Sequence, residues 1–152
     1  SNGAEQIAFR ARDCGMDIDY EGIRLTPSEI VAAAKEQGAH VVGLSILSGS
    51  HLPLIEETLA EMNQAGLSEV PLVVGGIIPE EDARRLRAMG VARVYTPKDF
   101  ELNRIIFDIV ALAEPGAVAR LITRDPKRPL PADVRIEEVV DALRAVRDRN
   151  AG

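Results

Sequence analysis

Three stretches of small and polar residues follow apolar runs and could bind a polar ligand. They are residues 45–51 (SILSGSH), 75–79 (GGIIP) and 95–98 (YTPK). Serine hydroxyls and backbone N–H groups hydrogen-bond polar ligands, and adjacent glycines let a ligand approach the backbone because no Cβ stands in the way. Tight turns between strands and helices would explain the same glycines and serines without a ligand. The loops alone leave both interpretations open.

The histidines and serines of the chain favour binding over catalysis. We expect His40 at the start of a buried strand, as a structural residue, and His51 at a helix start, where it contacts a ligand or caps the helix. A single histidine in that loop and a single cysteine, Cys14, argue against a metal site. Ser45 lies in no nucleophile-elbow motif. It also occupies the strand end at which a phosphorylated receiver domain would need an aspartate.

Alternating strands and helices are expected to position these loops. Parallel strands joined by helices place their carboxyl ends, and so the three loops, at one edge of a sheet. We therefore expect an α/β fold, a flavodoxin-like doubly wound parallel sheet covered by helices on both faces. The expected helices span residues 4–14, 27–37, 52–65, 79–89 and 98–112, and the expected strands span 16–20, 40–45, 70–74 and 92–95.

Local signals mark the ends and faces of these elements. Thr26 is expected to cap the second helix in a capping box with Glu29, and Gly38 to end that helix. Acids at 56–57 and 80–82 are expected in the first turns of their helices, where the helix dipole stabilises them. The apolar strand 40–45 is expected to be buried on both faces. The inward-facing residues expected in the third helix are Leu54, Ile55, Leu59 and Met62.

The composition excludes several classes of protein. The 152 residues carry 18 Lys and Arg against 24 Asp and Glu, a formal charge of −6, which argues against a nucleic-acid-binding protein. Two Tyr, three Phe and no Trp leave few aromatic surfaces for stacking. No apolar run reaches the roughly 20 residues of a membrane span. The lone cysteine fits the reducing cytoplasm, where we expect the protein to reside.

Both ends of the chain depart from a standard doubly wound domain. The strand that normally opens such a sheet is missing, so we expect it to precede Ser1. A proline-rich stretch, 113–133, is expected to be a linker or surface-hugging tail after the domain at 1–112. Residues 134–152 are expected to form an amphipathic helix that packs on the domain or on a partner subunit.

The first two loops resemble a known family. Residues 43–51 (GLSILSGSH) and 73–79 (VVGGIIP) resemble the Ser-x-Leu and Gly-Gly motifs of the cobalamin-binding domain of acyl-CoA mutases. The resemblance covers roughly residues 1–112. Residues 21–27 and 95–100 look closest to the ethylmalonyl-CoA mutase branch of this methylmalonyl-CoA mutase family.

The resemblance implies a cofactor and a site for it. The cofactor would be adenosylcobalamin, with Ser45 hydrogen-bonded to the buried nucleotide base, Leu47 packed on it, and Tyr95 and Thr96 at the far end of the slot. The axial histidine of the family's Asp-x-His-x-x-Gly motif would lie just before Ser1, so no metal ligand and no catalytic residue is expected in the chain. The cofactor-binding residues expected are Asn2, Gly3, Ser45, Leu47, Ser48, Gly49, His51, Gly75, Gly76, Ile77, Tyr95 and Thr96.

The resemblance also implies partners. A mutase barrel domain, in the same chain or a dimer mate, would hold the acyl-CoA, and the chain alone would be inactive. Ethylmalonyl-CoA would be isomerised to methylsuccinyl-CoA by an intact enzyme that is a homodimer, without nucleic acid or membrane. Three alternatives stay open: a methylmalonyl-CoA mutase-type domain, a corrinoid carrier of a methyltransferase, and a non-catalytic flavodoxin-like signalling or binding domain.

Overall fold

The chain forms two compact units in a computed structural model that describes residues 2–13, 16, 26–46, 51–96 and 102–113. One unit comprises residues 1–4 and 19–100, and the other comprises residues 5–18 and 101–152. The first unit contains the sheet and the loops of interest. The strand expected at 16–20, Cys14, the linker and the C-terminal helix fall wholly or mostly outside the described residues, so these expectations stay predictions.

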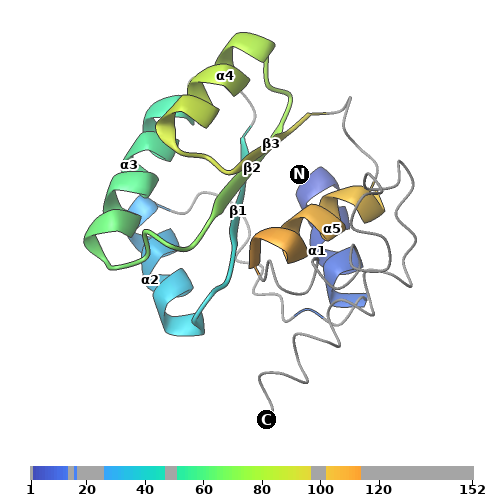
Figure 1. Cartoon of the computed structure of the whole chain (residues 1–152), viewed down its shortest axis with the longest axis horizontal. Coiled ribbons are helices and arrows are strands. Elements are labelled where there is room, and N and C mark those ends of the chain that lie inside the picture. The colour runs from blue at the N-terminus through green and yellow to red at the C-terminus, as the bar shows by residue number, and fades with distance from the viewer. Residues whose placement is uncertain (1, 14–15, 17–25, 47–50, 97–101, 114–152) are drawn as a thin grey trace, which may run out of the picture. The chain divides into compact units, whose positions relative to one another are not determined.

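Among the described residues, the sheet of the first unit has three parallel strands, at 42–46, 72–76 and 93–95, which lie side by side in chain order. Helices connect successive strands, and the helices described between residues 27 and 89 lie on the same side of the sheet (Figure 1). The α/β fold with parallel strands is therefore confirmed. In chain order the elements are α2 (Pro27–Gln37), β1 (Val42–Ile46), α3 (Leu52–Gln64), β2 (Leu72–Gly76), α4 (Glu80–Met89) and β3 (Arg93–Tyr95).

Alternate residues of the strands build the core between the sheet and these helices. Leu44, Val74 and Val94 lie in one register row, and Val74 and Val94 belong to the core cluster. Ile55 of α3 and Leu86 of α4 are completely buried in the same cluster. Burying an aliphatic side chain of this size contributes roughly 1.5–3 kcal/mol, so this layer holds the strands against the helices.

The other face of the sheet corrects one expectation. Gly43 and Ser45 are exposed, whereas Val73 beside them is only 6% exposed. The expectation that the first strand is buried on both faces is therefore wrong, because its small and polar residues alternate with its apolar ones. His40 also differs from expectation: it is exposed and lies two residues before β1.

The caps of α2 follow the sequence closely. Thr26 Oγ1 accepts a hydrogen bond of 3.2 Å from the Glu29 backbone N–H, and the Thr26 backbone N–H donates to Glu29 Oε1 at 3.4 Å. The helix ends at Gly38, whose φ of 60° is left-handed. Both ends were predicted because the cap signals are local.

Acidic residues lie in the first turn of α4 but not in the first turn of α3. Residues 80–82 lie in the first turn of α4, as predicted, but the acids at 56–57 lie beyond the first turn of α3. Pro79 occupies the N-cap position of α4, one residue before the helix. Of the inward-facing residues predicted for α3, Ile55 and Met62 are buried, and Leu54 and Leu59 are half-buried.

The second unit contains most of α1 (Asn2–Asp13) and all of α5 (Leu102–Ala113). Ala8 and Ala11 of α1 are buried, and their spacing of three residues places them on one face of the helix. Arg10 Nε donates a 3.2 Å hydrogen bond to Asn103 Oδ1 and so links the two helices. No helix among the described residues is long and apolar enough to span a membrane.

Candidate functional site

Three predicted site residues form one row across the sheet. The parallel register pairs Ser45 with Gly75 and Gly75 with Tyr95. Because side chains alternate along a strand, this row faces away from the core row of Leu44 and Val74. Strands joined by helices bring their carboxyl ends together, so residues far apart in the sequence become neighbours here.

The row offers hydroxyl groups on either side of a position without a side chain. Ser45 is exposed, Tyr95 is half-buried, and Thr96 directly after β3 is half-buried as well. A serine hydroxyl both donates and accepts hydrogen bonds, as does a tyrosine hydroxyl. The row is therefore suited to a polar group that lies along the sheet.

The two glycines at the end of β2 have different roles. Gly76 has a φ of 149°, and a Cβ built on it would overlap the carbonyl oxygen of Ile46 in β1. Glycine is required there by the fold itself, because β1 and β2 approach closely at this point. The packing of the strands therefore explains the glycine at position 76 without a ligand.

Gly75 is not required by the fold in this way. A Cβ at this position would lie 3.7 Å from the Tyr95 carbonyl oxygen and 4.0 Å from the Tyr95 Cβ, which are ordinary van der Waals distances. A strand normally gains from a side chain at such a position. The missing Cβ leaves a flat place between Ser45 and Tyr95, and a ligand that lies on the backbone fits there.

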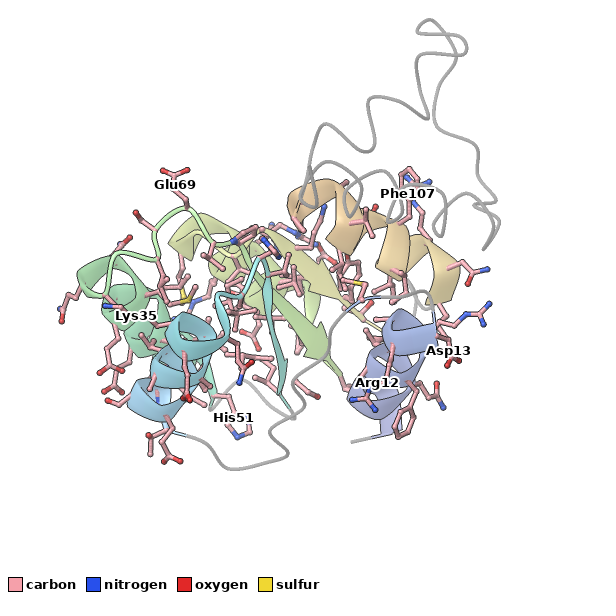
Figure 2. All side chains as sticks on the ribbon, turned by 90° about the horizontal axis from the view of Figure 1, so that it is seen from below. Arg12, Asp13, Lys35, His51, Glu69 and Phe107 are labelled. Atoms are coloured by element: carbon pink, nitrogen blue, oxygen red, sulfur yellow. The ribbon has the colours of Figure 1, made fainter. Side chains whose placement is uncertain are left out.

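His51 lies at the N-cap position of α3 and does not cap the helix with its side chain. It is half-buried, and Figure 2 shows it at the end of the sheet to which the strands point, with Glu69 at the opposite end. Among the described residues, no group of three or more His, Cys, Asp and Glu side chains could hold a metal ion. Because the His51 side chain makes no capping hydrogen bond, the capping role expected as one possibility for it is wrong.

The remaining predicted site residues are only partly placed. Asn2 and Gly3 open α1 and cluster with the sheet-containing unit. Ile77 follows Gly76 directly and is 73% exposed. Leu47, Ser48 and Gly49 lie outside the described residues. The structure thus brings together the strand-end residues of the site, and the roles of residues 47–49 stay predictions.

One residue on this face was missed. Arg93 lies two residues before Tyr95 in β3, on the same side of the strand, and is exposed. Its Nη1 donates a 2.8 Å hydrogen bond to the Ala92 carbonyl oxygen. The period-two alternation of β3 could have identified this charge as a neighbour of the site.

A groove at the amino end of the sheet is a poorer candidate. It has a volume of about 390 Å³ and is lined by the carboxyl-terminal half of α3, residues 67–71, the start of β2 and the end of α4. Leu59, Met62 and Met89 give it an apolar wall, and Glu69 is the charged residue in its lining. It contains none of the residues predicted to bind a ligand.

Comparison with known proteins identifies the part of the chain that carries these loops. The family model described as B12 binding domain matches residues 1–101. This range includes the whole row of Ser45, Gly75 and Tyr95 and every other predicted site residue.

Three acyl-CoA mutases are among the relatives of this chain. The ethylmalonyl-CoA mutase of Cereibacter sphaeroides is 74% identical over 119 residues, which are 78% of this chain and 18% of that protein. The ethylmalonyl-CoA mutase of Methylorubrum extorquens is 61% identical over 114 residues, 75% of this chain and 17% of that protein. The small subunit of 2-hydroxyisobutanoyl-CoA mutase from Aquincola tertiaricarbonis is 35% identical over 92 residues, 60% of this chain and 68% of that subunit. The chain thus spans less than a fifth of the length of the two ethylmalonyl-CoA mutases.

Proposed function

The chain belongs to the B12 binding domain family, and on this premise we propose that it is the cobalamin-binding module of an adenosylcobalamin-dependent acyl-CoA mutase. The observation that carries the proposal is the row of Ser45, Gly75 and Tyr95 across the strand ends. It provides hydroxyl groups around a place that has no side chain and that the fold does not need to keep empty. These features fit the nucleotide tail of a cobalamin.

Each residue has a distinct task in this proposal. The Ser45 hydroxyl hydrogen-bonds the base of the tail, Gly75 lets the tail lie on the backbone, and Tyr95 with Thr96 closes the end of the slot. Gly76 holds β1 and β2 together and so keeps Ser45 and Gly75 in register. Leu47, Ser48, Gly49 and His51 add contacts from the loop after β1, and Asn2 and Gly3 add them from the start of α1.

The chemistry of the reaction belongs to the cofactor. Bound adenosylcobalamin supplies the radical that starts a carbon-skeleton rearrangement. The residues of this chain bind and orient the cofactor and exclude water from its tail. None of them is proposed to act on the substrate.

We propose ethylmalonyl-CoA as the substrate and methylsuccinyl-CoA as the product. The support is the 74% and 61% identity to two ethylmalonyl-CoA mutases, against 35% to the 2-hydroxyisobutanoyl-CoA mutase subunit. Substrate contacts are assigned to an acyl-CoA-binding barrel domain. We propose that the barrel domain belongs to the same polypeptide, because the two ethylmalonyl-CoA mutases are more than five times as long as the parts that match this chain. We also propose that the intact enzyme is a cytoplasmic homodimer.

The experiment is a turnover assay of the full-length native protein with adenosylcobalamin. Ethylmalonyl-CoA is compared with methylmalonyl-CoA, and the products are identified by mass spectrometry. The proposal predicts conversion of ethylmalonyl-CoA to methylsuccinyl-CoA with the higher kcat/KM. A preference for methylmalonyl-CoA would contradict the proposed substrate. Failure to bind adenosylcobalamin would contradict the whole proposal.

A further inference from the structure

A hydrogen bond joins Arg10 of α1 to Asn103 of α5, two residues that are 93 positions apart in the sequence. Arg10 Nε donates to Asn103 Oδ1 at 3.2 Å, and both side chains are half-buried. Because the donor is charged and water is partly excluded, the loss of this bond costs more than the loss of an exposed bond between neutral groups. The proposed function gives neither residue a role.

The acceptor of this bond lies on a firmly held helix. Asn103 is in the first turn of α5, and five later residues of that helix are buried: Ile105, Ile106, Phe107, Ile109 and Val110. A helix with so many buried apolar side chains cannot shift without exposing them to water, which is unfavourable. Asn103 therefore offers Arg10 an acceptor at a fixed place.

The donor helix, α1, depends on support of this kind. It has 12 residues, and isolated helices of about this length are marginal in water. Gly3 lowers its helix propensity, and Asp13 places a negative charge at the carboxyl end, where the helix dipole disfavours it. Among its described side chains only Ala8 and Ala11 are buried, and alanine buries little apolar area. The hydrogen bond to α5 is therefore a substantial part of what holds α1 in place.

The opposite end of α1 carries two of the predicted cofactor-binding residues. Asn2 and Gly3 lie in its first turn and cluster with the sheet-containing unit. The helix is continuous, and about 12 Å along its axis separate Asn2 from Arg10. Because a helix this short tilts as one body, a change in its attachment at Arg10 displaces its first turn.

We propose that Arg10 and Asn103 are positioning residues for cofactor binding. Their hydrogen bond sets the orientation of α1 on α5 and thereby the place of Asn2 and Gly3. Neither Arg10 nor Asn103 touches the cofactor. The inference rests on the proposed function, and it extends the determinants of cofactor affinity from the strand ends to α5.

The test is a double-mutant cycle on the full-length native protein. Dissociation constants of cob(II)alamin are measured by absorbance titration, with circular dichroism to verify folding. Arg10→Met and Asn103→Leu each remove the hydrogen bond and should weaken binding about fivefold, which corresponds to about 1 kcal/mol. The double variant should bind no more weakly than either single variant, because all three lack the same bond.

Three further variants separate positioning from other effects. Arg104→Met removes a cation beside Asn103 whose ion pair with Asp108, at 3.7 Å, lies within α5. Phe9→Ala changes an exposed side chain next to Arg10. Both should bind cob(II)alamin as the wild type does. Asn103→Asp keeps the acceptor and adds a charge that strengthens the bond to Arg10, so it should bind at least as tightly as the wild type.

The possible results separate this inference from the function on which it rests. A pair that only stabilises the fold would lower the denaturation midpoint of Arg10→Met and leave its cob(II)alamin affinity unchanged, which would overturn the inference. Additive losses in the double variant, or weaker binding by Asn103→Asp, would overturn it as well. If the two removal variants fail to fold, Asn103→Asp decides alone. Wild-type protein that binds no cob(II)alamin would instead contradict the proposed function.

Discussion

Gly76 of β2 lies so close to the carbonyl oxygen of Ile46 in β1 that a Cβ on it would overlap that oxygen. Gly75, one residue earlier, has room for a Cβ between Ser45 and Tyr95. The two adjacent glycines therefore serve different purposes. Gly76 allows the close approach of the two strands, whereas the space beside Gly75 is not needed for their packing.

Gly76→Ala should destabilise the fold. The substitution combines a left-handed φ of 149° with a clash against backbone that cannot move without breaking the β1–β2 pairing. Strain of this kind costs about 1–3 kcal/mol before the clash is added. Chemical denaturation should show a loss of at least about 2 kcal/mol in the free energy of unfolding. An unchanged denaturation midpoint would show that the strand ends can separate at no cost.

Gly75→Ala should leave the fold intact and impair the site. Its Cβ would meet Tyr95 at ordinary contact distances, and alanine is favoured over glycine in a strand by roughly 0.5–1 kcal/mol. We therefore expect an unfolding free energy equal to or above that of the wild type. Titration should show weaker binding of cob(II)alamin. Wild-type affinity in a folded Gly75→Ala protein would mean that no ligand lies on this part of the backbone.

Ser45→Ala should weaken cobalamin binding by about 1 kcal/mol or somewhat more, through the loss of one hydrogen bond. Ser45 is exposed, so stability should change little. Cob(II)inamide, which lacks the base, should bind the variant and the wild type equally. If cob(II)alamin also binds both equally, Ser45 only shapes the end of β1.

Thr26→Ala should lower stability without affecting the site. The variant loses the hydrogen bond from the Glu29 N–H to Thr26 Oγ1, which is one of the two hydrogen bonds of the capping box. Loss of such an N-cap costs about 1 kcal/mol. Urea denaturation measures the loss, and cob(II)alamin titration is the control. A change in affinity would indicate that α2 is coupled to the strand ends.

The sequence predicted the elements where the signals were local. Thr26, Glu29 and Gly38 mark the ends of α2 because caps depend on a few neighbouring residues. The strand limits were less accurate: β2 was expected at 70–74 and spans Leu72–Gly76. Pairing with β1 and β3 sets those limits, and pairing partners are distant in the sequence.

The site shows the same division between local and distant effects. The three loops were expected at one edge of the sheet, and Ser45, Gly75 and Tyr95 lie in one row. The difference between Gly75 and Gly76 could not be predicted, because it depends on the carbonyl of Ile46 in another strand. The alternation of exposed and buried residues in β1 was not recognised in the sequence, because Gly43 was counted as part of a continuous apolar run.

We propose above that the row of Ser45, Gly75 and Tyr95 binds the nucleotide tail of a cobalamin. The most direct measurement is the ratio of the dissociation constants of cob(II)inamide and cob(II)alamin for the full-length native protein, in the wild type and in Gly75→Ala. We expect the wild type to bind cob(II)alamin at least about tenfold more tightly, equivalent to about 1.4 kcal/mol, and Gly75→Ala to lose most of this preference. Equal binding of the two ligands by the wild type would show that the row does not bind the nucleotide tail.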